Sequence, residues 1–164
     1  MPTSEKAGTN EPLSQDRSLR ILIVDDNSDL REMLARMVRR MGYAVATATT
    51  GAEALAHLRA RRADMLLLDL TLPDLDGVEV CRVVQREVAL RPLHIIITSA
   101  RDTLKDKATC FALGAAAYLT KPFGARELHA CLQVGEHMIR QQHSAVEYQR
   151  EGECYGRDWR ALAE

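Results

Sequence analysis

Short apolar runs alternate with longer amphipathic segments from residue 19 onward, and this alternation is the feature that most constrains the fold. The runs are rich in leucine and β-branched residues, which favours buried strands, and the segments between them are typical of helices. Strands that alternate with helices indicate a parallel sheet covered on both faces. We therefore expect a doubly wound α/β fold with five strands and five helices. The expected strands are residues 19–24, 44–48, 65–68, 93–97 and 116–119.

Glycines and capping residues mark the ends of the expected helices. Asn27 or Ser28 can cap the first helix, and Gly42 follows its end. The later helices are expected to begin near residue 51, at residue 77, after residue 102 and at residue 125 or 126. The last of them should bury Leu128, Leu132 and Ile139.

The chain length suits one domain with tails. With 164 residues and 46% hydrophobic residues, it can bury a real core but is too short for two full domains. We expect a flexible polar segment at residues 1–18, one domain at residues 19–140, and a tail or connector at residues 141–164. The first segment lacks the apolar stretch of a signal peptide or membrane anchor.

Charge and cysteine content argue against several classes of partner. The 22 basic and 23 acidic side chains give a net charge of -1, which indicates no general attraction to nucleic acid or to an anionic membrane. The four cysteines show no C-x-x-C pair, so we interpret them as reduced thiols that act as small hydrophobes. These observations predict a cytoplasmic chain without direct nucleic-acid or membrane binding.

Charged or hydroxyl side chains follow four of the expected strands. Asp25 and Asp26 come directly after the first strand, Asp69 after the third, Ser99 after the fourth and Lys121 after the fifth. Because ligands of open parallel sheets bind beyond the carboxyl ends of the strands, we expect these five residues to share one edge.

The chemistry of this group suits a metal cation and a phosphoryl group. Mg²⁺ prefers hard oxygen ligands and keeps several waters, so clustered carboxylates leave room for phosphate oxygens. An aspartate beside such a cation can attack phosphorus and form an acyl phosphate. Alignment and charge neutralisation are the main needs of phosphoryl transfer, and a cation and an ammonium supply both. Any one of these residues alone is better explained as a helix cap, a turn residue or a surface charge.

Four motifs contain these residues, and together they resemble the response-regulator receiver domain of two-component signalling. The resemblance covers about residues 19–140 and implies a flavodoxin-like sandwich with strand order 2-1-3-4-5. The motifs are ILIVDDN at residues 21–27, LLLDLTLPDLDG at 66–77, IIITSARD at 95–102 and GAAAYLTKPF at 114–123.

The resemblance implies a role for each matched residue. Asp69 is the implied phosphoryl acceptor, and Lys121 is the implied phosphate-binding amine. Asp25, Asp26 and Asp69, with the backbone carbonyl of Thr71, are the implied ligands of a Mg²⁺ cofactor. A sensor histidine kinase or a histidine phosphotransfer protein is the implied phosphoryl donor. The chain would then be a signalling module that catalyses only its own aspartyl phosphorylation and dephosphorylation.

The resemblance also implies a conformational switch. Ser99 matches the hydroxyl that binds the phosphoryl group, although Thr98 would serve if the register shifted by one residue. Tyr118 matches the aromatic residue that then turns, and Pro122 matches the proline of a cis peptide. The implied output is a changed protein-binding face for a downstream protein, an attached output domain or a second copy in a homodimer.

Two other functions share this scaffold. A magnesium-dependent phosphatase with an aspartyl nucleophile would need a second acid two residues after Asp69, where Thr71 stands instead. A nucleotide or flavin carrier would need a glycine-rich loop after the first strand, where Asp25 and Asp26 would repel phosphate. We keep the phosphatase as the alternative hypothesis and set the carrier aside.

The output and the arginines leave further alternatives open. We expect no DNA-reading domain after residue 140, so the chain is either a free-standing regulator or the front piece of a longer protein. Residues 141–164 are interpreted as a solvated tail, with extension of the last helix as the alternative. Arginines of the first two helices are interpreted as solvated faces, with a weaker alternative of docking a kinase. They are Arg31, Arg36, Arg39, Arg40, Arg59, Arg61 and Arg62.

Overall fold

The computed structural model describes residues 17–87, 90 and 92–161, with side chains as far as residue 146. Ser18–Ile139 form one compact unit, and the described residues from 140 onward belong to another. Most of the expected polar segment at residues 1–18 lies outside the described residues. The fold and the candidate site below belong to the unit of Ser18–Ile139.

Five parallel strands form one sheet in the order β2-β1-β3-β4-β5. This order and the parallel pairing confirm the expected doubly wound, flavodoxin-like fold. Because β1 and β3 are neighbours at the centre, the residues that follow them meet where the strand order reverses. The strands are β1 Arg20–Val24, β2 Ala44–Ala48, β3 Met65–Asp69, β4 His94–Ser99 and β5 Ala115–Thr120.

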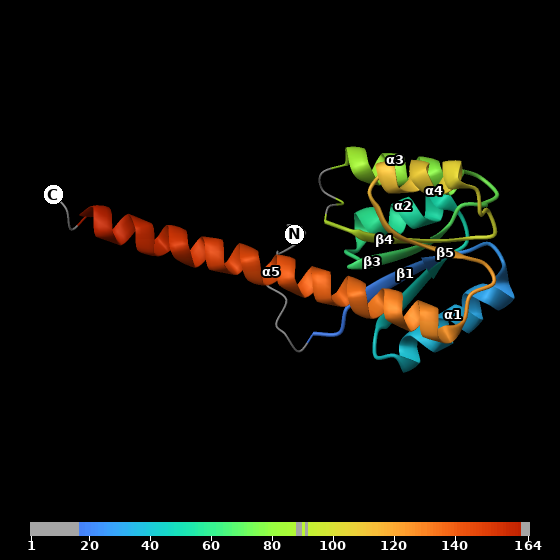
Figure 1. Ribbon diagram of the computed structural model, residues 1–164, viewed down its shortest axis with the longest axis horizontal. Coiled ribbons are helices and arrows are strands. Elements are labelled where there is room, and N and C mark those ends of the chain that lie inside the picture. Colours follow the sequence, from blue (N-terminus) through green and yellow to red (C-terminus); the bar gives the residue numbers. More distant parts are fainter. Residues whose placement is uncertain (1–16, 88–89, 91, 162–164) are drawn as a thin grey trace, which may run out of the picture. The chain divides into compact units, whose positions relative to one another are not determined.

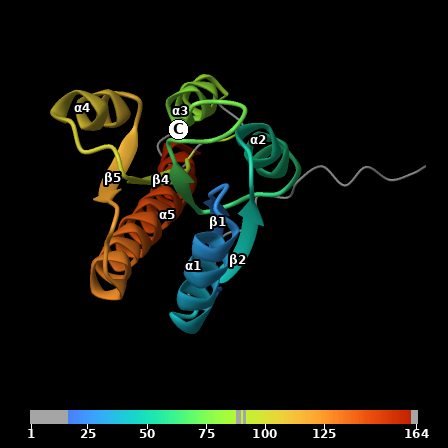
Figure 2. The same ribbon diagram turned by 90° about the vertical axis from the view of Figure 1, so that its right-hand side faces the viewer.

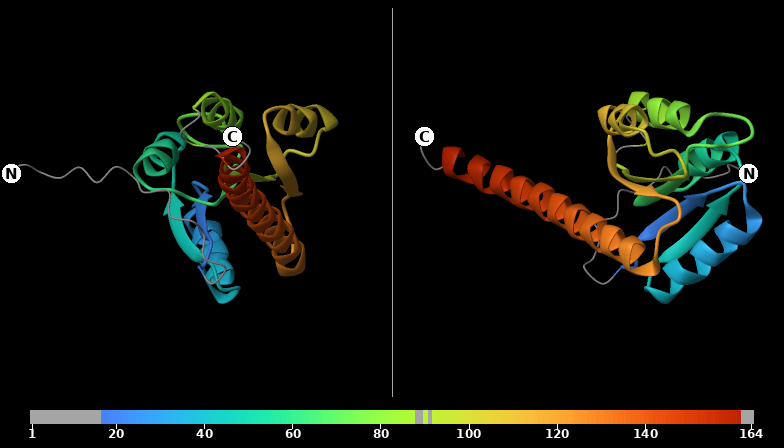
Figure 3. Two further views of the ribbon diagram at one scale, coloured as in Figure 1. Left: turned by 90° about the vertical axis from the view of Figure 1, so that its left-hand side faces the viewer. Right: turned by 45° about the vertical axis from the view of Figure 1, so that its right-hand side comes forward.

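Helices cover both faces of the sheet. In Figures 1 and 2, α2, α3 and α4 lie on one face, and α1 and the first part of α5 lie on the other. The two views of Figure 3 show the same layers. The helices are α1 Ser28–Arg40, α2 Gly51–Ala60, α3 Gly77–Arg86, α4 Leu104–Ala112 and α5 Ala125–Ala161.

The helix ends follow the expected capping chemistry. The side chain of Asn27 accepts a hydrogen bond from the backbone N–H of Leu30, which makes Asn27 rather than Ser28 the N-cap of α1. After α1 and α4, Gly42 and Gly114 have φ angles of 97° and 93°, which glycine adopts without steric cost.

Strand β4 is longer than expected, because it continues through Thr98 and Ser99. We expected it to end at residue 97 and Ser99 to follow it. Both polar residues are buried and remain in the ladder, where Thr98 is paired with Asp69 of β3 and Ser99 with Thr120 of β5. In a sequence, polar residues at the end of a buried strand resemble the start of a loop. In the structure, pairing of Thr98 with both neighbouring strands and of Ser99 with β5 keeps them extended.

The buried core is mainly apolar. Strand β3 is buried at every position, as a central strand covered on both faces must be. On α5, Leu128 and Leu132 are fully buried and Ile139 is 8% exposed, which confirms the three expected core residues of this helix. Their spacing places them on one face of the helix.

The described cysteines are free thiols. Cys81 and Cys110 are buried in the core, and Cys131 is partly buried. Burial raises the pKa of the Cys81 thiol to about 12, so it stays protonated and unreactive near neutral pH. This agrees with cysteines that act as small hydrophobes. The side chain of Cys154 lies outside the described residues.

Helix α5 is described to Ala161, well past the expected domain boundary at residue 140. The continuous helix agrees with the alternative in which the last helix is extended. A connector role for residues 141–164 stays a prediction. Within the described part of the chain, no helix is both long and apolar enough to cross a bilayer.

Helix α5 approaches the start of β4 closely because it carries a glycine there. A Cβ atom at Gly135 would lie 2.8 Å from Nε2 of His94, so any larger residue would displace the imidazole or the helix. Burial of His94 lowers the pKa of its imidazole below the usual value. His94 therefore enters the folded structure in its neutral form.

We expect this buried histidine to make the fold less stable at mildly acidic pH. The depressed pKa means that the unfolded chain binds a proton more readily, so stability is full above the unfolded pKa of about 6.5 and falls as pH decreases toward the folded pKa. Urea unfolding at pH values of about 7.5 and 5.5 measures this loss. The decrease in unfolding free energy between the two pH values should be smaller in His94→Gln than in the native protein. An equal decrease in the two proteins would contradict the assignment to His94.

Candidate metal and phosphoryl-transfer site

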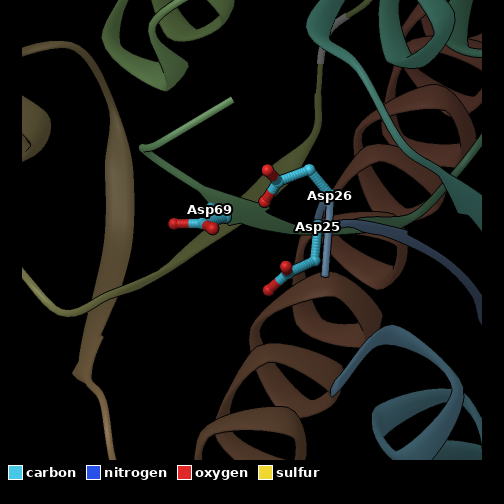
Figure 4. Close-up of side chains that lie close together, drawn as sticks. All are labelled: Asp25, Asp26 and Asp69. Atoms are coloured by element: carbon cyan, nitrogen blue, oxygen red, sulfur yellow. The ribbon is translucent and has the colours of Figure 1, made fainter. Parts of the chain in front are cut away.

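Three aspartates meet at the carboxyl ends of the two central strands. Asp25 and Asp26 directly follow β1, and Asp69 is the last residue of β3. Each contributes a carboxylate oxygen, and these atoms lie within 4.8 Å of one another. Figure 4 shows the three side chains gathered at the ends of the two strands. The parallel register that pairs Val24 with Leu68 brings the acids to one level.

The three acids differ in their exposure. Asp25 is 1% and Asp69 6% exposed, whereas Asp26 is open to solvent. The Asp25 carboxylate accepts a hydrogen bond from the backbone N–H of Asn27 at 2.9 Å, which holds it at the start of α1. The cluster therefore combines two fixed, buried oxygen donors with one accessible donor. Such a set suits a cation that enters from solvent and keeps some of its waters.

Lys121 brings the compensating positive charge from the end of β5. Its Nζ lies 2.8 Å from Oδ2 of Asp25 and 3.2 Å from Oδ2 of Asp69. The backbone N–H of Lys121 donates to the carbonyl of Ser99 at 2.7 Å, and the Lys121–Pro122 peptide is cis, as expected. The ammonium thus bridges the two buried carboxylates.

One ammonium does not fully compensate two buried carboxylates. Burial raises the pKa of the Asp69 carboxyl, Lys121 opposes this rise, and the negative charge of Asp25 adds to it. For Lys121, burial lowers the pKa, but the hydrogen bond to Asp25 and the charge of Asp69 outweigh it and the pKa is raised. The site therefore has excess negative charge that a divalent cation would neutralise.

The loop after β3 holds the Asp69 side chain in place. Oδ1 of Asp69 accepts a hydrogen bond from the backbone N–H of Thr71 at 3.2 Å. The backbone N–H of Gly77, at the start of α3, donates to the carbonyl of Leu70 at 2.8 Å. A Cβ atom at Gly77 would lie 2.6 Å from the Asp69 carbonyl oxygen and 2.7 Å from the Leu70 Cα. Helix α3 can thus start against the β3 strand only with glycine at this position.

We expect Gly77→Ala to destabilise the protein and to displace the chain at Asp69. The added methyl group meets backbone atoms that cannot rotate away, and overpacking of this kind costs about 1–3 kcal/mol. Chemical unfolding measures the loss. Gly124→Ala is the matched control, because a Cβ atom at Gly124 would meet nothing within 4 Å. Equal stability of the two variants would contradict the close approach.

Ser99, Arg101 and Tyr118 form a connected chain beside the acid cluster. The Ser99 hydroxyl, fully buried at the end of β4, accepts a hydrogen bond from the backbone N–H of Arg101 at 3.1 Å. The Tyr118 hydroxyl donates to the backbone carbonyl of Arg101 at 2.6 Å. Burial raises the pKa of the Tyr118 hydroxyl. The loop at Arg101 therefore links the two residues that the sequence predicts to act together.

Contacts between residues that are separated along the chain complete the site. The sequence did not predict these contacts. A guanidinium nitrogen of Arg101 lies 3.0 Å from Oδ2 of Asp76, the N-cap of α3, and so ties the β4–α4 loop to the β3–α3 loop. The Arg31 side chain donates to the Asp25 carbonyl at 2.9 Å, so Arg31 is not only part of a solvated face. The sequence predicted the start of α3 at residue 77, but neither the capping role of Asp76 nor its arginine partner.

The structure thus brings Asp25, Asp26, Asp69 and Lys121 into one group. Thr71 contacts Asp69 through its backbone N–H; a ligand role for its carbonyl stays a prediction. The fold and this acid cluster define a flavodoxin-like α/β domain with its polar site at the carboxyl ends of the strands.

Comparison with known proteins identifies the family. The model of the response regulator receiver domain matches residues 21–133, and the chain belongs to this family. It is 40% identical over 111 residues to the alkaline phosphatase synthesis transcriptional regulatory protein PhoP of Bacillus subtilis, a match that covers 68% of this chain and 45% of PhoP. It is 42% identical over 113 residues to the response regulator MprA of Mycobacterium bovis, covering 69% of this chain and 48% of MprA.

A solved structure supports the same fold. A CheY-like response regulator receiver domain protein from Methanospirillum hungatei matches with a TM-score of 0.69 and 28% identity, over 79% of this chain and 99% of that one. The present chain spans a little under half the length of PhoP and MprA.

Proposed function

We propose that this receiver domain accepts a phosphoryl group on Asp69 and, by doing so, changes a protein-binding face. The observation that carries the proposal is the position of the Asp69 carboxylate, 3.2 Å from the Lys121 ammonium and within 4.8 Å of the other two acids. A nucleophile with a fixed cation on one side and metal-ligating oxygens on the other is arranged for phosphoryl transfer.

The three carboxylates fit Mg²⁺, because they are hard oxygen donors with uncompensated negative charge. Asp25, Asp26 and Asp69 would hold the ion, together with the Thr71 carbonyl. When bound, Mg²⁺ would neutralise phosphoryl oxygens and so lower the barrier to attack by an anion.

The residues of the chain perform the transfer itself. A carboxylate oxygen of Asp69 attacks phosphorus, the new O–P bond forms, and the bond from phosphorus to the donor's leaving group breaks. Lys121 orients the phosphoryl oxygens and balances their charge. We propose a histidine kinase or a histidine phosphotransfer protein as the donor, in which case the leaving group is an imidazole nitrogen that takes up a proton.

The proposed switch runs through the loop at Arg101. Phosphoryl oxygens on Asp69 would attract the Ser99 hydroxyl, which now accepts from the Arg101 N–H, and the loop would move with it. Tyr118 donates to the carbonyl of Arg101 and would follow that movement. The result is a population shift between two packings, driven by charge-assisted hydrogen bonds.

The face that would change carries exposed apolar side chains on α4. Leu104 is 83% and Phe111 48% exposed, and α4 packs beside β5. We propose this surface as the site for a downstream protein, an attached output domain or a second copy of the chain. The names of PhoP and MprA describe regulators, one of them transcriptional, so an attached output domain is a proposal for this chain too. We also propose a cytoplasmic location, where such kinases transfer phosphate.

Phosphorylation by acetyl phosphate tests the proposed function and its phosphatase alternative together. The full chain should take up a phosphoryl group from acetyl phosphate when Mg²⁺ is present and not when EDTA removes it. Intact-mass spectrometry should show at most one phosphoryl group per chain. Sustained turnover of a panel of phosphate esters would instead indicate the phosphatase. No observation favours the phosphatase. It would need a second acid two residues after Asp69, and that position holds Thr71.

A further inference from the structure

An open cavity of about 410 Å³ lies between α1 and the edge strand β2, apart from the acid cluster. Its volume is within the range of about 300–1,000 Å³ that is usual for small-ligand sites. Five of its lining residues come from α1 and one from β2. They are Arg31, Glu32, Ala35, Arg36, Arg39 and Thr47.

Half of the residues that line the cavity are arginines, and Glu32 is the one acid among them. Among the described residues, Arg36 and Arg39 are in no ion pair, whereas several other arginines of this domain are matched to acids. Positive charge is therefore concentrated here, although the net charge of the chain is -1.

Glu53, an acid whose ionisation is influenced by Arg31, is engaged elsewhere. Glu53, at the start of α2, accepts hydrogen bonds from the backbone N–H and the hydroxyl of Thr49 at 2.9 and 2.8 Å. These bonds lower the pKa of Glu53, with a smaller contribution from Arg31. Glu53 thus remains ionised but directed to Thr49, and it does not supply the cavity arginines with a hydrogen-bonded partner.

The spacing of the arginines suits an anion with several charged groups. Arg31, Ala35 and Arg39 follow one another at intervals of four residues, so they lie along one side of α1 over about 12 Å. Arg36 lies on the neighbouring row beside Glu32. Guanidinium groups bind phosphate oxygens through two parallel N–H donors, and the exposed Thr47 can add a hydroxyl donor from the opposite wall.

We propose that this cavity binds a small polyphosphate anion, held by Arg31, Arg36 and Arg39. Free polyphosphate and the triphosphate of a nucleotide share the required chemistry. The site goes beyond the proposed phosphorylation of Asp69 and needs neither a phosphoryl donor nor Mg²⁺.

Arg31 connects this site to the acid cluster. Its guanidinium already donates to the carbonyl of Asp25, the residue whose side chain contacts Lys121. An anion that recruits Arg31 competes for that guanidinium and alters the hydrogen bond. The backbone N–H of Asp26 belongs to the same peptide group as the Asp25 carbonyl, so its NMR shift reports the change.

Titration of the full chain with sodium tripolyphosphate tests the proposal. The buffer contains EDTA, which removes divalent metals. It also contains about 0.15 M salt, which screens non-specific electrostatic attraction between the anion and the protein. We expect saturable binding of one anion per chain, with NMR shifts at Arg36, Arg39 and Thr47 and a parallel shift of the Asp26 amide. ATP in a second arm distinguishes the sources: tighter binding assigns the site to a nucleotide, and equal binding assigns it to the phosphate chain alone.

Charge-matched variants separate this site from general electrostatics. R36Q/R39Q should weaken tripolyphosphate binding by at least about tenfold, because two charge-assisted contacts are lost. R61Q/R86Q removes the same charge from exposed positions outside the cavity and should bind as the native chain does. Equal weakening in both variants, or no saturable binding, would overturn the proposal. A titration without the Asp26 shift would remove Arg31 from it.

This outcome is independent of the proposed phosphorylation. The titration uses unphosphorylated protein without metal, so a chain that never accepts a phosphoryl group on Asp69 could still bind the anion. Conversely, normal phosphorylation with no anion binding would leave the receiver function intact and remove only the cavity site.

Discussion

Asp69→Asn is expected to reduce phosphorylation by acetyl phosphate to background while the protein remains folded. The amide is a poor nucleophile, and no other carboxylate occupies its position at the end of β3. The substitution keeps the size of a side chain that is only 6% exposed, so the core is not disturbed. Phosphate-affinity electrophoresis after incubation with Mg²⁺ and acetyl phosphate measures the loss.

Circular dichroism of the same variant serves as its control. A native helical spectrum together with a lost phosphoryl band would assign the loss to chemistry rather than to unfolding. Phosphorylation of Asp69→Asn at the native rate would remove Asp69 from the acceptor role, whatever the state of the other acids.

Asp26→Asn is expected to weaken Mg²⁺ binding by at least about tenfold, because even the loss of an outer partner of a metal ligand typically costs 10–100-fold in affinity. Asp26 is the exposed member of the acid cluster, so its charge can be removed without leaving Lys121 unpaired. Isothermal titration with Mg²⁺ measures the change in affinity.

The matched control for this change is Asp29→Asn. Asp29 is also exposed, lies in the first turn of α1, and is not among the three clustered acids. It should bind Mg²⁺ as the native chain does. If both variants lose affinity equally, general electrostatics rather than ligation explains Asp26, and an unchanged affinity in Asp26→Asn would contradict the proposed ligand set.

Much of the fold was predictable because its sheet is buried. A central strand such as β3 reads as an unbroken apolar run, and each helix begins at a capping residue or a glycine. The run at residues 44–48 gave the bounds of β2 without error. The end of β4 was less clear, because pairing with neighbouring strands keeps Thr98 and Ser99 extended in a way that local sequence does not indicate.

The acid cluster was predictable for a topological reason. Residues that follow parallel strands must share one edge, so Asp25, Asp26, Asp69 and Lys121 could be grouped before any distance was known. Their spacing in the structure agrees with that grouping. The chemical roles of these residues are a separate matter and stay predictions.

The contacts that surround the cluster could not be predicted. The Arg101 side chain donates to the carboxylate of Asp76, 25 residues earlier in the chain. The Arg31 side chain donates to the backbone carbonyl of Asp25, six residues earlier. Gly135 makes room for His94 across the interior of the domain. These contacts depend on the relative placement of helices and loops, and no local pattern of charge or hydrophobicity specifies the partner.

Reductive trapping of the phosphorylated chain tests the central claim most directly. Borohydride converts an aspartyl phosphate to homoserine, so mass spectrometry of the digested protein locates the acceptor. After incubation with acetyl phosphate and Mg²⁺, we expect the conversion at Asp69 alone and none when EDTA replaces the metal. Conversion at another acid, or at Asp69 without any divalent cation, would contradict the account of a metal-assisted phosphoacceptor site.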